Sequence, residues 1–338
     1  ARSNTLQAAS GNQSVAIGLF NIASTTNTIA IGISNSATNT NATAVGQSNI
    51  ARGVRSSAFG YLNLASGSKS SASGYSNTAS GYASSSFGRS NLASGSRSSA
   101  SGYVNTASGS NSSASGYDNT ASGSNSFAFG RSNLASGSYS FAFGYSNTTS
   151  GYRSSAFGYS NLASATNTSA FGFDNTASAT SSSSFGHVNI SSASFASTFG
   201  ANNTASATGS SAFGSFITNA IASSTMLGPS DASKLTINFA GNAGFGTTTP
   251  EWALQIATTS KPQLTLSDSG SITNNHWSFR NAGGILYLAT SSPSTFATSS
   301  ASALTINANG FLGIGTTTPA QELSIQGNTY LTGGLGVG

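Results

Sequence analysis

Apolar and small polar positions alternate in short phrases that recur every 14 residues along most of this chain. The phrase Ser14-Val15-Ala16-Ile17-Gly18 returns as Thr28-Ile29-Ala30-Ile31-Gly32, and later as Ser57-Ala58-Phe59-Gly60 with a larger apolar residue. Because strand side chains point alternately to opposite faces, Ala58 and Gly60 share one face and Phe59 lies on the other. A thin roll of two sheets has little interior. We therefore expect the small residues to face inward and the large ones outward.

The period is strict from Gly18 to Gly228, with glycine at every fourteenth position and usually alanine two residues before it. A fixed period of this kind predicts a solenoid, and 14 residues are too few for the helical repeats of about 33 or more. They suit two short strands and two tight turns. We predict an all-β fold for residues 1–228, a parallel β-roll whose coils have 14 residues each.

The residue before each repeat glycine forms a long apolar column, interrupted only by Ser73, Ser101 and Ser115. Large exposed apolar surfaces mark interaction sites, and burying one such side chain contributes about 1.5–3 kcal/mol. We predict a subunit interface along this column. An alternative, in which the rings pack inside a wider single-chain roll, stays open. The column consists of Ile17, Ile31, Val45, Phe59, Phe87, Phe129, Phe143, Phe157, Phe171, Phe185, Phe199 and Phe213, and ends at Leu227.

Asparagine stands three residues after the glycine in fourteen successive coils. Identical amides stacked coil on coil can hydrogen-bond along the axis as a ladder, and asparagine tolerates turn conformations. We predict such a structural ladder in preference to a ligand-binding role. Its members are Asn21, Asn35, Asn49, Asn63, Asn77, Asn91, Asn105, Asn119, Asn133, Asn147, Asn161, Asn175, Asn189 and Asn203.

These phrases, together with the Ala65-Ser66-Gly67 phrase that recurs at Ala93 and Ala121, resemble the head repeats of YadA-like trimeric autotransporter adhesins. The resemblance covers roughly residues 5–228. It implies left-handed parallel β-rolls, three side by side, with the apolar strand face turned to the threefold axis. Phenylalanine in place of isoleucine or valine departs from the family pattern, as do the serines in the apolar column.

Residues 229–338 follow a second, longer repeat. Residues 235–256 return 69 residues later as 304–325, and each copy contains a Gly-Xaa-Gly-Thr-Thr-Thr-Pro phrase. We predict small β-rich modules here, separated from the roll by a turn at Gly228-Pro229-Ser230-Asp231. The phrase resembles short modules of phage tail fibres and large bacterial surface proteins, which tend to be trimeric. Apolar heptads of a coiled-coil stalk are absent from this part of the sequence.

The 11 basic and 6 acidic residues leave a net charge of +5 spread over 338 residues, without a basic run. The composition therefore does not favour a nucleic-acid partner. Cysteine is absent, which excludes disulfides and thiol chemistry. The sequence contains neither an apolar stretch long enough to span a membrane nor a signal peptide. We expect the chain to be a piece of a longer protein.

The titratable side chains are too few and too scattered for catalysis. Asp118 and Asp174 lie four coils apart, about 19 Å along the axis. His187 shares a column with Tyr145, and we expect a turn residue there. Of His276, Trp277 and Arg280, either a small sugar-binding patch or a structural tryptophan is conceivable. The other acids are Asp231, Glu251, Asp268 and Glu322. We predict no enzyme, no cofactor and no metal site.

The sequence thus favours a homotrimeric extracellular or cell-surface fibre that attaches to cells, matrix or glycans. A phage tail fibre or receptor-binding fibre is the alternative, and an ice- or mineral-binding solenoid has little support because threonine is scattered. Candidates for partner contact are one column of tyrosine and arginine, although solvated turn residues would explain it too. This column contains Tyr61, Tyr75, Tyr103, Tyr117, Tyr145, Tyr159, Arg89 and Arg131.

Overall fold

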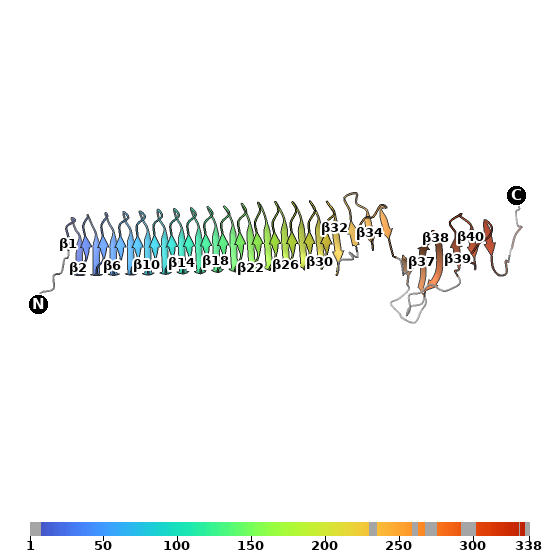
Figure 1. The fold of residues 1–338 in the computed structure, drawn as a ribbon, viewed down its shortest axis with the longest axis horizontal. Helices are drawn as coiled ribbons and strands as arrows, with labels where there is room; N and C mark the ends of the chain where they lie inside the picture. The colour runs from blue at the N-terminus through green and yellow to red at the C-terminus, as the bar shows by residue number, and fades with distance from the viewer. Residues whose placement is uncertain are drawn as a thin grey trace. The chain divides into compact units, whose positions relative to one another are not determined.

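The computed structural model describes residues 8–229, 235–258, 263–267, 276–291, 302–330 and 332–334. The chain divides into two compact units, Ala1–Ala232 and Ser233–Gly338. In the described residues all regular structure is β-strand, as Figure 1 shows.

Each coil of the first unit contains one long strand and one strand of two residues. The long strands are β2 (Val15–Leu19), β4 (Ile29–Ile33), β6 (Thr43–Gln47), β8 (Ser57–Tyr61), β10 (Ser71–Tyr75), β12 (Ser85–Arg89), β14 (Ser99–Tyr103), β16 (Ser113–Tyr117), β18 (Phe127–Arg131), β20 (Phe141–Tyr145), β22 (Ser155–Tyr159), β24 (Ser169–Phe173), β26 (Ser183–His187), β28 (Ser197–Ala201), β30 (Ser211–Ser215) and β32 (Thr225–Gly228).

The two-residue strands alternate with them along the chain. They are β1 (Ala8–Ala9), β3 (Ile22–Ala23), β5 (Ser36–Ala37), β7 (Ile50–Ala51), β9 (Leu64–Ala65), β11 (Thr78–Ala79), β13 (Leu92–Ala93), β15 (Thr106–Ala107), β17 (Thr120–Ala121), β19 (Leu134–Ala135), β21 (Thr148–Thr149), β23 (Leu162–Ala163), β25 (Thr176–Ala177), β27 (Ile190–Ser191), β29 (Thr204–Ala205) and β31 (Thr218–Asn219).

Every strand pairs in parallel with its equivalent in the next coil. In β18 and β20, for example, Phe129 stands opposite Phe143 and Gly130 opposite Gly144. The short strands pair in the same register, as in Thr120 opposite Leu134. The pairing produces two parallel sheets joined by turns, and it confirms the prediction of a parallel β-roll with 14-residue coils.

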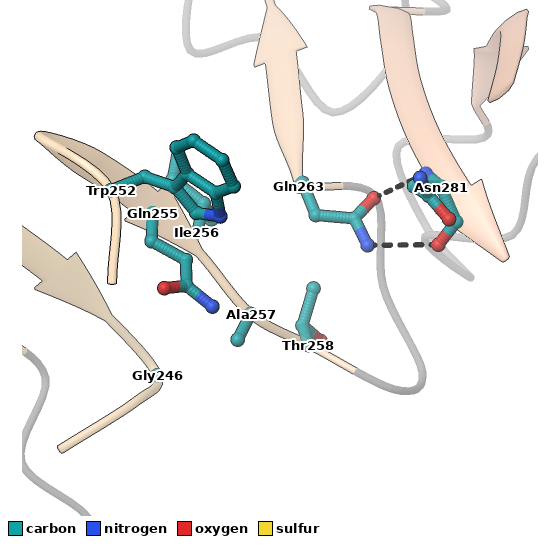
Figure 2. Close-up of a pocket in the computed structure, with 8 residues that line it drawn as sticks. All are labelled: Gly246, Trp252, Gln255, Ile256, Ala257, Thr258, Gln263 and Asn281. Carbon is teal, nitrogen blue, oxygen red and sulfur yellow. Dashed lines mark hydrogen bonds between the residues drawn. The ribbon is translucent and has the colours of Figure 1, made fainter. Parts of the chain in front are cut away.

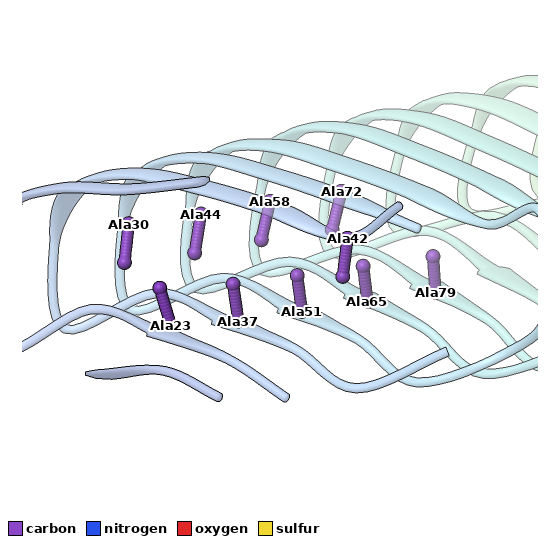
Figure 3. Packing of buried hydrophobic residues seen from close by; sticks show 10 residues of the cluster. All are labelled: Ala23, Ala30, Ala37, Ala42, Ala44, Ala51, Ala58, Ala65, Ala72 and Ala79. Atoms are coloured by element: carbon purple, nitrogen blue, oxygen red, sulfur yellow. The ribbon is translucent and has the colours of Figure 1, made fainter. Parts of the chain in front are cut away.

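Alanine side chains fill the narrow interior between the two sheets. Ala58 and Ala72 of the long strands and Ala51 and Ala65 of the short strands are completely buried. Figure 3 shows that the two rows point toward each other. The inward placement of the small residues agrees with the alternation in the sequence.

Three consecutive interior positions carry hydroxyls instead of methyl groups. Ser184, Ser191 and Thr198 are fully buried. The Ser184 hydroxyl donates to Ser191 Oγ at 3.0 Å, and Ser191 Oγ lies 2.9 Å from Thr198 Oγ1. Thr198 Oγ1 donates in turn to Ser184 Oγ at 3.0 Å. The hydroxyls satisfy one another, so the polar substitutions fit inside the roll without an unpaired group.

The turns hold a residue with positive φ every seven residues, at both edges of the roll. Most of these residues are not glycine, and Val104 and Val188 are even β-branched. A left-handed conformation costs roughly 1–2 kcal/mol for such residues. Hydrogen bonds between coils hold them there: the N–H of Asn41 donates to the Thr26 carbonyl at 3.0 Å, and that of Ser48 to Ile33 at 2.8 Å.

The repeat glycine occupies a conformation that other residues rarely adopt. Gly130 has φ of 116°, and a Cβ added there would overlap the carbonyl oxygen of Gly144 in the next coil. Both facts exclude a side chain. The close approach leaves the Gly144 carbonyl free to accept from the amide of Asn133, at 2.7 Å.

The asparagine column runs along one edge of the interior, and every member is buried. Asn147 shows the arrangement. Its Nδ2 donates to the carbonyls of Phe143 in its own coil at 2.8 Å and of Gly158 in the next at 2.7 Å. Its Oδ1 accepts from the N–H of Asn161 at 3.0 Å and from Asn161 Nδ2 at 2.9 Å. Each amide therefore connects neighbouring coils through both of its polar atoms.

In the second unit, two copies of one small module repeat the same pairing. β33 (Leu235–Ile237) pairs antiparallel with β34 (Ala243–Phe245), which pairs in parallel with β35 (Leu254–Ile256). β39 (Leu304–Ile306), β40 (Leu312–Ile314) and β41 (Leu323–Ile325) do likewise. Asn238 donates to the Pro250 carbonyl at 2.8 Å, and Asn307 to that of Pro319 at 3.4 Å. The Thr-Thr-Thr-Pro phrase is thus held by an asparagine of the preceding turn.

Three further strands complete the second unit. β36 (Leu264–Leu266), β37 (His276–Ala282) and β38 (Ile285–Ser291) form an antiparallel arrangement, and β38 also pairs with β39. The described segments 235–237 and 304–306 confirm strands at the repeated Leu-Thr-Ile phrases.

We expect Asn147→Ala to lower the free energy of unfolding by about 3 kcal/mol or more. The change leaves buried partners of the amide in two coils without a hydrogen bond, at about 1–3 kcal/mol each. Chemical denaturation followed by circular dichroism measures the loss.

Asn111→Ala is the matched control, because Asn111 is an exposed turn residue and Ala83 occupies the equivalent turn with φ of 52°. It should cost less than about 1 kcal/mol. Equal losses in the two variants would show that the buried ladder adds nothing to stability.

Candidate functional site

The apolar column lies on the outer face of the long-strand sheet, in the middle of each strand. Its rings stack on one another from Phe129 to Phe213, with centroids 4.8–5.1 Å apart. Stacking covers the ring faces along the axis, but the outward edges stay open. Phe59 and Phe87 are 40% and 42% exposed, respectively. The rings therefore do not pack inside the roll.

The tyrosine and arginine column lies on the same outer face, beside the apolar column. Tyr61 is the last residue of β8, two positions after Phe59, so the two side chains share one face. His187 ends β26 in the same way, and our expectation of a turn residue there is wrong. The glycine does not terminate the strand, since pairing continues through the residue that follows it.

This column is a continuous stack over ten coils, from Tyr61 to His187. Tyr61 stacks on Tyr75 at 5.2 Å, and Arg89 lies over the rings of Tyr75 and Tyr103 at 5.3 and 5.5 Å. The remaining contacts continue the stack through Tyr117, Arg131, Tyr145, Tyr159, Phe173 and His187. The sequence identified the tyrosines and arginines as exposed candidates, but not their contact with one another.

The YadA head domain repeat family matches the chain at residues 9–34, 37–63, 93–119, 107–133, 135–161 and 199–216. The matched segments coincide with the coils described above. Residues 9–216 carry YadA head repeats. No curated protein matches the chain.

The YadA head repeats place the acidic side chains far from any catalytic partner. Asp118 and Asp174 are exposed at turns, with φ of 55° and 53°, and Glu251 and Glu322 are exposed in the second unit. Asp231 and Asp268 lie outside the described residues. Among the residues that are described, no group of three His, Asp or Glu side chains is placed to hold a metal ion. In the same residues, no helix has the length and apolarity needed to cross a membrane.

Strand geometry separates the mixed cluster of the second unit. His276 and Arg280 share one face of β37, and Trp277 lies on the opposite face because it occupies an alternate position. Trp277 stands opposite Leu266 of β36 and is 47% exposed. The three side chains therefore do not form a single patch.

A shallow hollow in the second unit is lined by one aromatic ring and three amides. Figure 2 shows Trp252 and Gln255 on one side and Gln263 with Asn281 on the other. Gln263 makes two hydrogen bonds to the backbone of Asn281, at 3.0 and 2.8 Å. The lining contains no titratable side chain, so the hollow offers no acid or base for chemistry.

The edge of the roll that begins each new coil carries several exposed cations, which the sequence did not single out. Arg55 and Lys69 occupy equivalent turn positions in consecutive coils, and Arg97 stands two coils further. Lys69 Nζ donates to the hydroxyl of Tyr82 at 2.8 Å and lies over its ring at 5.1 Å. The hydrogen bond from Lys69 lowers the pKa of Tyr82, with smaller effects of the Arg97 and Arg55 charges.

We expect Lys69→Met to raise the pKa of Tyr82 back toward its ordinary value. The variant removes both the donor and the positive charge that stabilise the phenolate. Titration of the tyrosine Cζ resonances by NMR, with Tyr82→Phe for assignment, measures the change.

Lys69→Arg keeps the charge and is the control, in which the pKa should stay below the ordinary value. A Tyr82 titration that is the same in the wild type and in Lys69→Met would contradict the contact.

Proposed function

We propose that the chain forms the homotrimeric shaft or head of an extracellular adhesive fibre, with the outer face of the long strands buried between its three copies. The observation that carries the proposal is the unpartnered apolar column on that face of a roll built from YadA head repeats. That repeat family belongs to adhesins and is homotrimeric.

Burial between copies is the physical reason for the column. Seven phenylalanines follow one another from Phe129 to Phe213. Each ring is only partly covered within one chain. Complete burial of such a ring contributes about 1.5–3 kcal/mol, and the contribution recurs in every coil of every copy. The gain suffices to hold three narrow rolls together along their length.

Threefold symmetry also gives the tyrosine and arginine column a place. A ring of three copies has head-to-tail interfaces, in which one edge of a face meets the opposite edge of the next copy. Tyr61 and its equivalents line one edge of the long-strand face, and small residues such as Ser57, Ser71 and Ser85 line the other. Large side chains against small ones fit closely, so we place this column at the seam between copies rather than in contact with a foreign partner.

The long parallel stack suits a fibre that holds a binding surface away from a cell. Fifteen intervals from Gly18 to Gly228 at about 4.8 Å each give a rod of roughly 70 Å. Attachment to cells, matrix or glycans is the role of such a rod. A receptor-binding fibre of a phage is the second candidate, favoured by the two equivalent Thr-Thr-Thr-Pro modules. Neighbouring genes for tail assembly would decide for it.

We expect Phe143→Asp combined with Phe157→Asp to split the trimer, because two carboxylates in each copy would be buried at the threefold axis. Light scattering coupled to size-exclusion chromatography should give three times the 33.4 kDa chain mass for the wild type and one chain mass, or aggregated protein, for the variant.

Two further variants separate an interface defect from misfolding. Leu134→Asp with Leu162→Asp makes the same change on the opposite outer face and should stay trimeric. Phe143→Ser with Phe157→Ser should keep its fold, since serine occupies this position at Ser101 and Ser115, but dissociate at higher protein concentration than the wild type. A wild-type monomer, or a stable trimer of the aspartate variant, would refute the interface.

A further inference from the structure

The first half of the roll carries only one sign of charge. Residues 1–117 contain no Asp or Glu, whereas Arg52, Arg55, Lys69, Arg89 and Arg97 lie within the described coils of that segment. The first acid is Asp118, at the opposite edge of the roll. The positive charge in these coils is therefore not neutralised within the roll.

Four of these cations gather at one edge, which we call the basic ridge: Arg52, Arg55, Lys69 and Arg97. All four are exposed. Arg55, Lys69 and Arg97 occupy the same turn position in three coils, and with a coil spacing of about 4.8 Å they extend over roughly 14 Å. Tyr82 lies among them and is fixed against Lys69.

The ridge departs from the way the roll treats its other charges. Arg89 and Arg131 are separated by three coils, and each lies between two aromatic rings. In the ridge, Arg55 and Lys69 occupy adjacent coils, where like charges opposite each other destabilise paired strands. An anion bound along the edge would remove that repulsion.

We propose that the basic ridge binds a linear acidic polysaccharide, whose sulfate or carboxylate groups pair with Arg55, Lys69 and Arg97 along the rod axis. The choice of an extracellular polysaccharide rests on the surface-fibre function proposed above. Guanidinium groups suit bidentate contacts with such anions. The exposed ring of Tyr82 offers a flat apolar surface for a sugar face.

Two features favour a polysaccharide over a nucleic acid. Proteins that hold single-stranded nucleic acids combine a positive groove with several aromatic platforms for successive bases. The ridge is a convex edge made of turns, with the ring of Tyr82 between its cations. Its neighbours along the turn column are Asn27, Asn41, Asn111 and Asn125, whose amides can hydrogen-bond to sugar hydroxyls.

The test measures binding of a fluorescent heparin octasaccharide to the full chain by anisotropy, between 50 and 200 mM NaCl. Arg55→Gln with Lys69→Gln should weaken binding by about tenfold and reduce the salt slope by about 1.4, the value for two lost ionic contacts to a single-stranded polyanion. Arg131→Gln with Arg153→Gln removes the same charge elsewhere on the roll and should change affinity less than about twofold. The mass of each variant is measured alongside.

Equal weakening in the two double variants would reduce the effect to net charge and overturn the proposal. Displacement of the octasaccharide by an equal concentration of a single-stranded oligonucleotide would overturn the choice of a polysaccharide. A trimeric wild type that fails to bind heparin at 150 mM NaCl would refute the ridge and leave the fibre intact. Ridge-dependent binding by a monomer would support the ridge and refute the trimer.

Discussion

Hydrogen bonding from each coil to the next is the interaction on which the whole roll depends. The interior consists mainly of alanine, which buries little apolar area per residue, so the core alone cannot order a chain of this length. The paired strands, the turn N–H groups and the asparagine amides bond along the axis instead. Stability therefore adds up from neighbour to neighbour, as in other solenoids. The two invariant requirements, glycine at the close approach and asparagine behind it, follow from this stacking.

The same stacking decides which side chains the outer face can carry. Equivalent positions in consecutive coils lie about 4.8 Å apart, which is a favourable distance for flat rings. Phenylalanine and tyrosine therefore follow one another, as in the stack of Phe143 on Phe157 at 4.9 Å. Repeated cations would repel at that distance, and Arg131 accordingly stands between rings. The adjacent Arg55 and Lys69 are an exception to this arrangement, which is why the ridge points to a ligand.

The sequence predicted the features that depend on periodicity and missed those that depend on winding. The glycine and alanine columns were enough to predict the coil length, the parallel pairing and the inward face. The end of the long strand was misplaced because glycine usually interrupts a strand, whereas Gly186 with φ of 117° lets His187 continue the pairing. The basic ridge could not be recognised because its residues are scattered along the sequence and meet only after the chain winds. Likewise, nothing in the turns predicted left-handed residues as unfavourable as Val104.

The end of the roll shows how a stack of identical coils is closed. Ile217 takes the place of the next asparagine, and its N–H still donates to Asn203 Oδ1 at 3.0 Å, so the ladder ends with its last acceptor satisfied. Met226 and Ile221 pack against Ile217 and fill the space that alanine occupies elsewhere. Asn219, also buried, binds the carbonyls of Ser211 and Ser224. A terminal coil has no following coil to cover it, so larger side chains and an inward amide must do so. The change of residue type at this point is therefore a cap, and it separates the stacked coils from the modules that follow.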